Sequence, residues 1–178
     1  MHTLIGGTTE SGKSSLAKML HVSARKRGVK TIVLTPFGWN DEKPDVLTDN
    51  QTVFLDNYWK SENCFVFIDE GRQTVGRYNE AMTLTAVQGR HWGHSNFYIV
   101  QRIHMLHPDI REQCSQIFLF CSAPKSAESA AEEFVNDSLL EAPNLKRGEY
   151  IRCLRFGPDG GKFSERGKAF TYDPNFTK

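Results

Sequence analysis

The sequence has no dense cysteine framework, no long apolar run and no excess of charge of one sign. Its four cysteines are widely spaced, and three of them lie in apolar, strand-like stretches. This pattern predicts buried, reduced thiols rather than a set of disulfides or a zinc site. No apolar run approaches the roughly 18 residues that span a bilayer, and the N-terminus lacks the basic-then-apolar pattern of a secretory signal. These absences favour an intracellular protein with no membrane span.

The balance of charge excludes further classes of protein. The 178 residues include 22 Lys and Arg against 21 Asp and Glu, so the formal net charge is +1. This balance argues against a uniformly basic nucleic-acid binder and against an acidic disordered tail, although it allows a local basic surface. The chain contains no internal repeat or low-complexity segment. It is long enough for one full core and short for two, so we predict a single domain over residues 1–178.

Apolar runs of strand length alternate with stretches that have helical periodicity. The strand-like runs are residues 2–6, 30–35, 64–69, 96–101 and 116–121. The helix-like stretches are residues 12–27, 79–90 and 127–135. This alternation predicts an α/β fold in which helices cover both faces of a mostly parallel central sheet. In such a sheet the carboxyl ends of the strands lie together, and ligands usually bind there.

Two segments depart from this alternation. Residues 36–47 carry two prolines, so we expect an ordered loop there rather than a helix. Near the C-terminus, residues 149–156 and 163–172 read as strands on either side of a glycine-rich turn. We predict that this β-hairpin, over about residues 149–172, adds antiparallel strands to an edge of the sheet.

The first strand-like run leads into a complete phosphate-binding motif. Residues 7–14, Gly-Thr-Thr-Glu-Ser-Gly-Lys-Ser, fit the pattern G-x-x-x-x-G-K-[ST] without a mismatch, between a strand and a helix. Glycines let the backbone N–H groups turn towards phosphate oxygens, and the helix N-terminus adds a partial positive charge. Lys13 is expected to reach the β- and γ-phosphates, and Ser14 to offer its hydroxyl to Mg²⁺. The predicted nucleotide-binding residues are Gly7, Thr8, Thr9, Glu10, Ser11, Gly12, Lys13, Ser14 and Ser15.

A second element of the site is a pair of carboxylates at the end of a strand. Residues 65–70, Phe-Val-Phe-Ile-Asp-Glu, are apolar until the last two. On a parallel sheet Asp69 would lie near the P-loop and hold Mg²⁺. Glu70 would then orient or deprotonate a water in line with the γ-phosphate. The plain alternative is an ordinary exit from strand to loop. With the P-loop upstream, the pair favours an ATPase that uses ATP and Mg²⁺.

The next strand-like run contributes a polar tip and a preceding arginine. Gln101 ends the run, where an amide can touch both the γ-phosphate and the attacking water and so sense the state of the nucleotide. Arg90 precedes the same run, at the end of the sheet opposite the phosphates of its own subunit. An arginine there could act in trans at a neighbour's site in a ring. Arg72, Arg77 and Arg102 compete for that role, and a surface arginine paired with a carboxylate is the plain alternative.

These motifs are followed along the chain by residues 107–113, His-Pro-Asp-Ile-Arg-Glu-Gln, and by a Phe-rich strand. In this order they resemble the FtsK–HerA branch of P-loop ATPases, over about residues 1–122. Within that branch the chain is most similar to the genome-packaging ATPases of tailless, membrane-containing icosahedral viruses and related phages. The resemblance implies the additional-strand, catalytic-glutamate type of P-loop NTPase fold.

The same resemblance implies residue roles, partners and a location. The catalytic and magnesium-holding set that it implies is Lys13, Ser14, Asp69, Glu70, Gln101 and Arg90. Such proteins form homo-oligomeric rings, usually hexamers or pentamers, that thread double-stranded DNA of the viral genome into a preformed capsid. They act beside capsid vertex proteins, in the host cytoplasm and at the virion vertex. This chain departs from the pattern in having no appended nuclease and no clearly basic DNA-binding domain.

Three other functions fit parts of the sequence. One is an assembly or extrusion ATPase like those of filamentous phages, which carry a similar Gly-Arg-His segment but usually continue into a membrane-spanning segment. Another is a small-molecule or nucleoside kinase, which would need an arginine-rich lid and an acceptor pocket. The third is a regulatory nucleotide-binding switch that barely hydrolyses ATP.

Several polar and aromatic positions have local interpretations. Candidate DNA-contacting loops are residues 38–43, with an exposed Trp39, and residues 58–60. The pair His91 and His94 is interpreted as polar loop residues at the nucleotide end of the sheet rather than as part of a zinc site. The solvated face expected on the last predicted helix consists of Glu128, Glu132 and Glu133.

Overall fold

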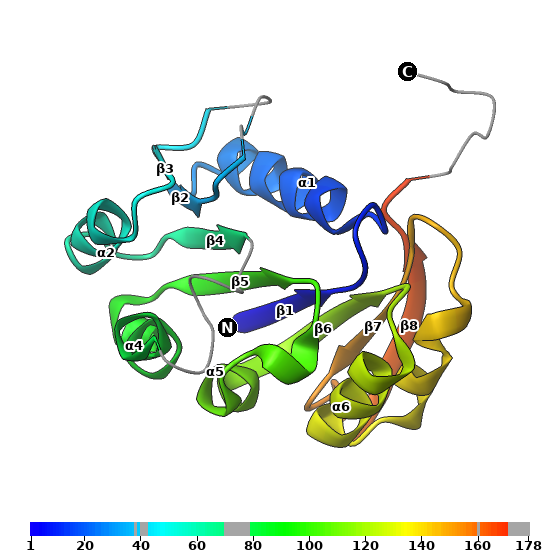
Figure 1. Ribbon diagram of the computed structural model, residues 1–178. Helices are drawn as coiled ribbons and strands as arrows, with labels where there is room; N and C mark the ends of the chain where they lie inside the picture. The colour runs from blue at the N-terminus through cyan, green and yellow to red at the C-terminus, as the bar shows by residue number, and fades with distance from the viewer. Residues whose placement is uncertain (38, 40–42, 70–78, 160, 171–178) are drawn as a thin grey trace.

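A sheet of eight strands forms the centre of the molecule (Figure 1). The computed structural model describes residues 1–37, 39, 43–69, 79–159 and 161–170. The strands are β1 (His2–Gly6), β2 (Thr31–Leu34), β3 (Val46–Thr48), β4 (Phe65–Asp69), β5 (Ser95–Val100), β6 (Cys114–Phe120), β7 (Glu149–Leu154) and β8 (Phe163–Lys168). Their order across the sheet is β3-β2-β4-β5-β1-β6-β7-β8.

The sheet is mostly parallel. Every pairing from β3 across to β6 is parallel, whereas β7 pairs antiparallel with both β6 and β8. Strand β5 lies between β1 and β4, which is the additional strand that the family resemblance implies. The predicted α/β class and the C-terminal antiparallel hairpin are therefore confirmed. Below, the carboxyl end of the sheet is the end at which the parallel strands finish, and the amino end is the opposite one.

Helices cover both faces of this sheet (Figure 1). Helix α1 lies on one face, and α2, α4, α5 and α6 contribute to the core on the other. Among the described residues, no helix has the length and apolar character needed to cross a bilayer. The helices are α1 (Lys13–Lys26), α2 (Gln51–Trp59), α4 (Glu80–Gln88), α5 (Pro108–Gln113) and α6 (Pro124–Phe134), with 3₁₀ turns η1 (Gly89–Trp92), η2 (Ile103–Met105) and η3 (Asp137–Asn144).

Helix α2 and strand β3 were not predicted from the sequence. Asn50 begins α2 by accepting hydrogen bonds from the backbone N–H groups of Thr52 and Val53. Phe54 and Tyr58, one turn apart, are then both fully buried. The interpretation of residues 58–60 as a loop is wrong, because α2 continues to Trp59. Tyr58 belongs to the core and donates its hydroxyl hydrogen to the carbonyl oxygen of Thr85 at 3.0 Å, so it is not available to contact DNA.

Trp39 is buried rather than exposed. Only 5% of the residue is accessible, and its indole N–H donates to His21 Nδ1 at 3.3 Å. Its ring centroid lies 5.8 Å from that of Phe67, whose ring is stacked on Phe97 at 4.7 Å. A tryptophan that finds both an apolar partner and a hydrogen-bond acceptor is drawn into the core. The expectation that Trp39 is exposed is therefore wrong, whereas residues 38 and 40–42 of the same predicted DNA-contacting loop lie outside the described residues.

The amino end of the sheet contains buried histidines. His94 is 1% exposed, and its Nδ1 accepts a hydrogen bond from the backbone N–H of Cys64 at 3.2 Å. His91 and His94 both precede the start of β5, so they lie at the amino end of the sheet. The prediction that they lie at the nucleotide end of the sheet is wrong. The four cysteines are free, and three of them are buried.

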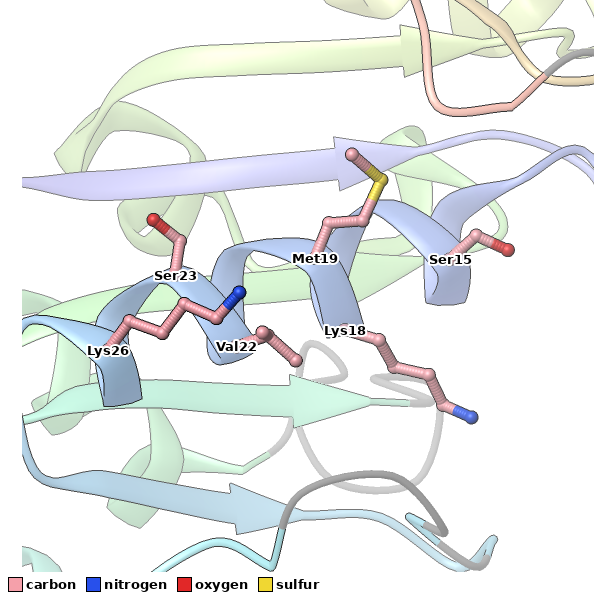
Figure 2. A pocket seen from close by; sticks show the side chains of 6 residues that line it. All are labelled: Ser15, Lys18, Met19, Val22, Ser23 and Lys26. Atoms are coloured by element: carbon pink, nitrogen blue, oxygen red, sulfur yellow. The ribbon is translucent and has the colours of Figure 1, made fainter.

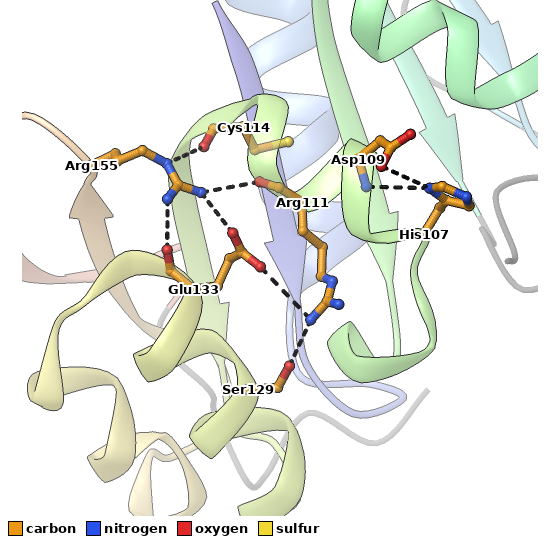
Figure 3. A network of polar contacts seen from close by, with 7 residues as sticks. All are labelled: His107, Asp109, Arg111, Cys114, Ser129, Glu133 and Arg155. Atoms are coloured by element: carbon orange, nitrogen blue, oxygen red, sulfur yellow. Dashed lines mark hydrogen bonds and ion pairs between the residues drawn. The ribbon is translucent and has the colours of Figure 1, made fainter.

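An ionic network joins α5, α6 and Arg155, the residue that follows β7 (Figure 3). The Glu133 carboxylate accepts a hydrogen bond from Arg155 at 3.1 Å and lies 3.8 Å from the guanidinium of Arg111. Arg155 also donates to the backbone carbonyls of Cys114, Arg111 and Glu133 itself. The side chain of Glu133 is only 14% exposed. The expectation that it is part of a solvated face is wrong, because its α6 position faces two arginines from neighbouring elements.

Removing this carboxylate should destabilise the fold. Glu133→Ala leaves two partly buried guanidiniums without their shared acceptor, so we expect the free energy of unfolding to fall by about 2 kcal/mol. Urea denaturation at neutral pH measures this loss. Glu132→Ala is the matched control, because Glu132 is an exposed neighbour on the same helix, and its effect should stay within about 0.5 kcal/mol. Equal losses in the two variants would contradict the role of the network.

Acidic pH should destabilise the protein through His2. This first residue of β1 is fully buried, and its Nδ1 accepts a hydrogen bond from the backbone N–H of Asn96 at 3.2 Å. Burial, with smaller effects of the N-terminal ammonium, Arg90 and His94, lowers the pKa of His2 to about 4. The unfolded chain takes up this proton at higher pH. The free energy of unfolding should therefore fall by roughly 3 kcal/mol as the pH decreases from about 6.5 to 4.

The variant His2→Asn isolates this contribution. Asparagine retains an acceptor for the Asn96 N–H but has no proton to gain in this range. Denaturation curves measured at pH values between 4 and 7 should give a flatter dependence on pH for the variant than for the wild type. The same slope in both proteins would contradict the assignment to His2.

Candidate functional site

The P-loop follows β1 at the carboxyl end of the sheet. The backbone has positive φ at Gly7 (149°), Glu10 (61°) and Gly12 (119°). A Cβ atom at Gly7 would lie 2.7 Å from Cβ of Phe120 and 3.1 Å from the carbonyl oxygen of Cys121. Only glycine therefore fits at this position, where the chain turns away from the strand.

The base of the loop is tied to the strands on both sides of β1. The N–H of Gly7 donates to the carbonyl oxygen of Val100 at the end of β5, at 3.2 Å. The N–H and the hydroxyl of Thr8 both donate to the carbonyl oxygen of Cys121, just beyond β6, at 2.8 and 3.1 Å. These bonds fix the position of the loop relative to two neighbouring strand ends.

Lys13 turns back into the loop. Its Nζ donates to the carbonyl oxygen of Thr8 at 2.6 Å, and only 8% of the residue is accessible. Ser11 is also buried, and its hydroxyl has no hydrogen-bond partner among the described residues. Ser14 and Ser15, in the first turn of α1, are exposed. The ammonium and the N-terminus of α1 together provide positive charge and backbone N–H donors that suit an anionic phosphate chain.

Asp69 and Gln101 lie at the same end of the sheet as the P-loop. Asp69 ends β4 and is in register with Ile99 of β5, which is in register with Ile5 of β1. Two strand spacings place the backbone of Asp69 about 10 Å from that of β1. Gln101 follows β5 directly and is exposed between them. Glu70 lies outside the described residues.

The donor set at this end of the sheet suits Mg²⁺. The Ser14 hydroxyl and the Asp69 carboxylate are hard oxygen ligands, and Mg²⁺ usually completes its shell with waters and phosphate oxygens. Among the residues that the structure describes, no group of three or more His, Cys, Asp or Glu side chains could hold a metal ion by itself.

Arg90 lies at the opposite end of the sheet. It is an exposed residue of η1, and its guanidinium donates to the side-chain oxygen of Gln113. Strand β5 alone, six residues long, spans roughly 20 Å between this end and Gln101. Arg90 therefore does not reach the P-loop of its own chain. Arg102, by contrast, is exposed next to Gln101, while Arg72 and Arg77 lie outside the described residues.

The turn that leads into the C-terminal hairpin also borders the P-loop, a contact that sequence reasoning missed. Because β7 runs antiparallel to β6, the turn that precedes it lies at the carboxyl end of the sheet. There Arg147 Nε donates to the carbonyl oxygen of Glu10 at 3.0 Å, and the N–H of Gly148 donates to that of Ser11 at 2.9 Å. In the sequence Lys146 and Arg147 are only an isolated basic pair. The antiparallel direction of the predicted hairpin was the feature that could have placed them.

A pocket also opens along the outer face of α1 (Figure 2). Within the described part of the chain, all of its lining residues come from this one helix. It lies along the helix and not at the strand ends, although Ser15 at one end belongs to the predicted nucleotide set. The lining residues are Ser15, Lys18, Met19, Val22, Ser23 and Lys26.

No family model and no curated protein matches the chain by sequence. Comparison of structures finds similar proteins. B204, the genome-packaging NTPase of Sulfolobus turreted icosahedral virus 2 in complex with ATP-gammaS, matches with a TM-score of 0.73 at 16% identity, over 92% of this chain and 95% of that chain.

Two further solved structures share the arrangement. VirB4 of Thermoanaerobacter pseudethanolicus matches with a TM-score of 0.70 at 10% identity, over 97% of this chain and 90% of that chain. The pCW3 conjugation coupling protein TcpA, in its monomer form with ATPgS, matches with a TM-score of 0.65 at 18% identity, over 91% of this chain and 59% of that chain. The resemblance inferred from the motifs is thus confirmed in the fold: the chain has the P-loop NTPase fold of B204, VirB4 and TcpA.

Proposed function

We propose that this chain is the ATP-hydrolysing subunit of a motor that translocates double-stranded viral DNA into a preformed capsid. The observation that carries the proposal is a complete P-loop with Asp69 and Gln101 at the same end of a sheet whose fold is that of B204. The subunits would form a ring of five or six copies, and the ring would work beside capsid vertex proteins. The alternatives to packaging are extrusion, a regulatory switch and phosphoryl transfer to a small acceptor.

Each residue of the site would have a separate role in ATP hydrolysis. Lys13 would leave the Thr8 carbonyl for the β- and γ-phosphates, while the N-terminus of α1 binds phosphate oxygens through its backbone N–H groups. Ser14 and Asp69 would hold Mg²⁺, which when bound neutralises charge on the phosphates. Glu70 would accept a proton from the attacking water, and Gln101 would contact that water and so register the loss of the γ-phosphate.

Two variants test the catalytic assignment. Lys13→Ala removes the cation that stabilises the transferred phosphate, so ATP hydrolysis should fall by about 100-fold or more. Glu70→Gln removes the base and should cause a similar loss while leaving ATP binding intact. Release of inorganic phosphate measures both. Arg166→Ala is the control, because Arg166 is an exposed residue of β8 that pairs with Glu141. Normal turnover by Glu70→Gln would contradict the water-activating role.

The motor assignment makes the rate depend on assembly and on DNA. The rate per subunit should rise with protein concentration and rise again when linear double-stranded DNA is added. A rate per subunit that depends neither on protein concentration nor on DNA would favour a site complete within one subunit. Phosphoryl transfer to small acceptors would then be the function to test. ATP binding with no hydrolysis under any of these conditions would favour the regulatory switch.

Mixed assemblies test whether Arg90 acts at a neighbour's site. Arg90→Ala and Glu70→Gln should each be inactive alone, since a trans-acting arginine contributes about 10³ to 10⁵ in rate. Mixing the two variants should restore activity, because an intact site on an Arg90→Ala subunit then receives Arg90 from its neighbour. Arg102→Ala is the contrast. Arg102 lies at the nucleotide end of its own chain, so mixing Arg102→Ala with Glu70→Gln should restore nothing. Without recovery in the first mixture, the trans-acting residue is not Arg90.

A further inference from the structure

The positions of Asp69 and Gln101 give the triphosphate a direction. Both follow strands on one side of β1, because β5 and β4 are its successive neighbours there. On the proposed function the γ-phosphate reacts near these two residues, on their side of the P-loop. The nucleoside, at the other end of the triphosphate, would then leave the loop towards β6, β7 and β8. The described residues that border the loop on that side are Phe120 and Cys121 at the end of β6, and Arg147, Gly148 and Phe170 at the two ends of the hairpin.

Two side chains at the base of the hairpin, Arg147 just before β7 and Phe170 just after β8, meet beside the loop. The guanidinium carbon of Arg147 lies 6.0 Å from the centroid of the Phe170 ring, which is a cation–π distance. The same guanidinium group is bonded through Nε to the carbonyl oxygen of Glu10 within the P-loop. Arg147 is exposed and Phe170 is partly buried, so the pair borders solvent at the mouth of the loop.

The backbone around this pair is closely packed. Gly148 has φ +85°, and a Cβ there would lie 2.5 Å from the carbonyl oxygen of Phe170. The N–H of Ala169 donates to the carbonyl oxygen of Gly148 at 2.8 Å, and the N–H of Gly148 donates to that of Ser11. A Cβ at Gly12 would come within 3.1 Å of the Phe170 ring. The two ends of the hairpin and the P-loop therefore form one packed unit, and it holds Arg147 in place before any ligand arrives.

We propose that Arg147 and Phe170 form the nucleoside-binding wall of the site and that the Arg147 guanidinium stacks on the base. This inference rests on the proposed function, since it assumes that the P-loop binds a nucleoside triphosphate. A planar, delocalised cation that is already oriented by a carbonyl and a ring suits stacking against the π-face of a base. Because the side chain is held at two points, binding also costs less side-chain entropy. Arg147 is thus a binding residue for the nucleoside and not for the phosphates.

The competing explanation is that Arg147 only supports the P-loop through its bond to Glu10. The two explanations differ in the part of the ligand that they affect. A wall for the nucleoside acts on ATP but not on inorganic tripolyphosphate, which lacks base and sugar. A support for the loop acts on both ligands to the same extent.

Calorimetric titration of both ligands, with Mg²⁺ present, separates these explanations. For Arg147→Ala we expect the Kd for ATP to rise about tenfold, in the range of a lost base-stacking contact, and the Kd for tripolyphosphate to change less than about twofold. Arg147→Lys keeps the charge but loses the planar group, so it should also weaken ATP binding. Arg166→Ala removes an exposed arginine of the same hairpin that pairs with Glu141, and it should change neither affinity.

Each other outcome overturns the proposal in a distinguishable way. Equal weakening of ATP and tripolyphosphate by Arg147→Ala would assign Arg147 to support of the loop. Full ATP affinity in Arg147→Lys would assign it to a charge contact instead of stacking. Unchanged affinities in both Arg147 variants would remove it from the site altogether. If the wild type binds neither ligand, the proposed function itself fails. If it binds tripolyphosphate as tightly as ATP, the phosphate site stands and the nucleoside wall does not.

Discussion

The anchoring of the P-loop to the strand ends on both sides of β1 is the constraint on which the site depends. Gly7 is bonded to Val100 and Thr8 to Cys121, so the shape of the loop follows the register of β5, β1 and β6. That register is set by strands that are buried on both faces, with Ile5, Ile99 and Phe118 among the core residues. The sheet thus acts as a rigid support that presents one flexible cationic side chain, Lys13, on a fixed backbone.

Much of the fold and part of the site could be predicted because their causes are local in the sequence. Apolar runs of strand length, separated by periodic helical stretches, predict parallel strands with helices on both faces. The P-loop motif is contiguous, so its position between β1 and α1 follows directly. The placement of Asp69 and Gln101 at the P-loop end follows from topology alone, since parallel strands finish together. The roles of these residues in catalysis, and all that concerns Glu70, stay predictions.

The features that sequence reasoning missed depend on partners that are distant along the chain. Trp39 and Tyr58 are aromatic residues among polar neighbours, and only the presence of His21 and Thr85 explains why they are buried. Glu133 lies at a helix position that would be solvated if two arginines, one in α5 and one just after β7, did not face it. The bond between Arg147 and Glu10 joins residues 137 positions apart. No local sequence pattern predicts these distant contacts. The antiparallel direction of the predicted hairpin, however, indicates that Arg147 lies at the P-loop end of the sheet.

Strand β5 connects Arg90 at the amino end of the sheet with Gln101 at the carboxyl end. η1, with Arg90, precedes it, Gln101 follows it, and five of its six residues are buried. A strand packed this densely transmits a displacement along its axis instead of absorbing it by bending. In an assembly of the kind proposed, the residue that meets a neighbour's phosphates and the residue that senses the chain's own would be joined by a single stiff element. Events at successive sites would then be ordered in time through the strand itself.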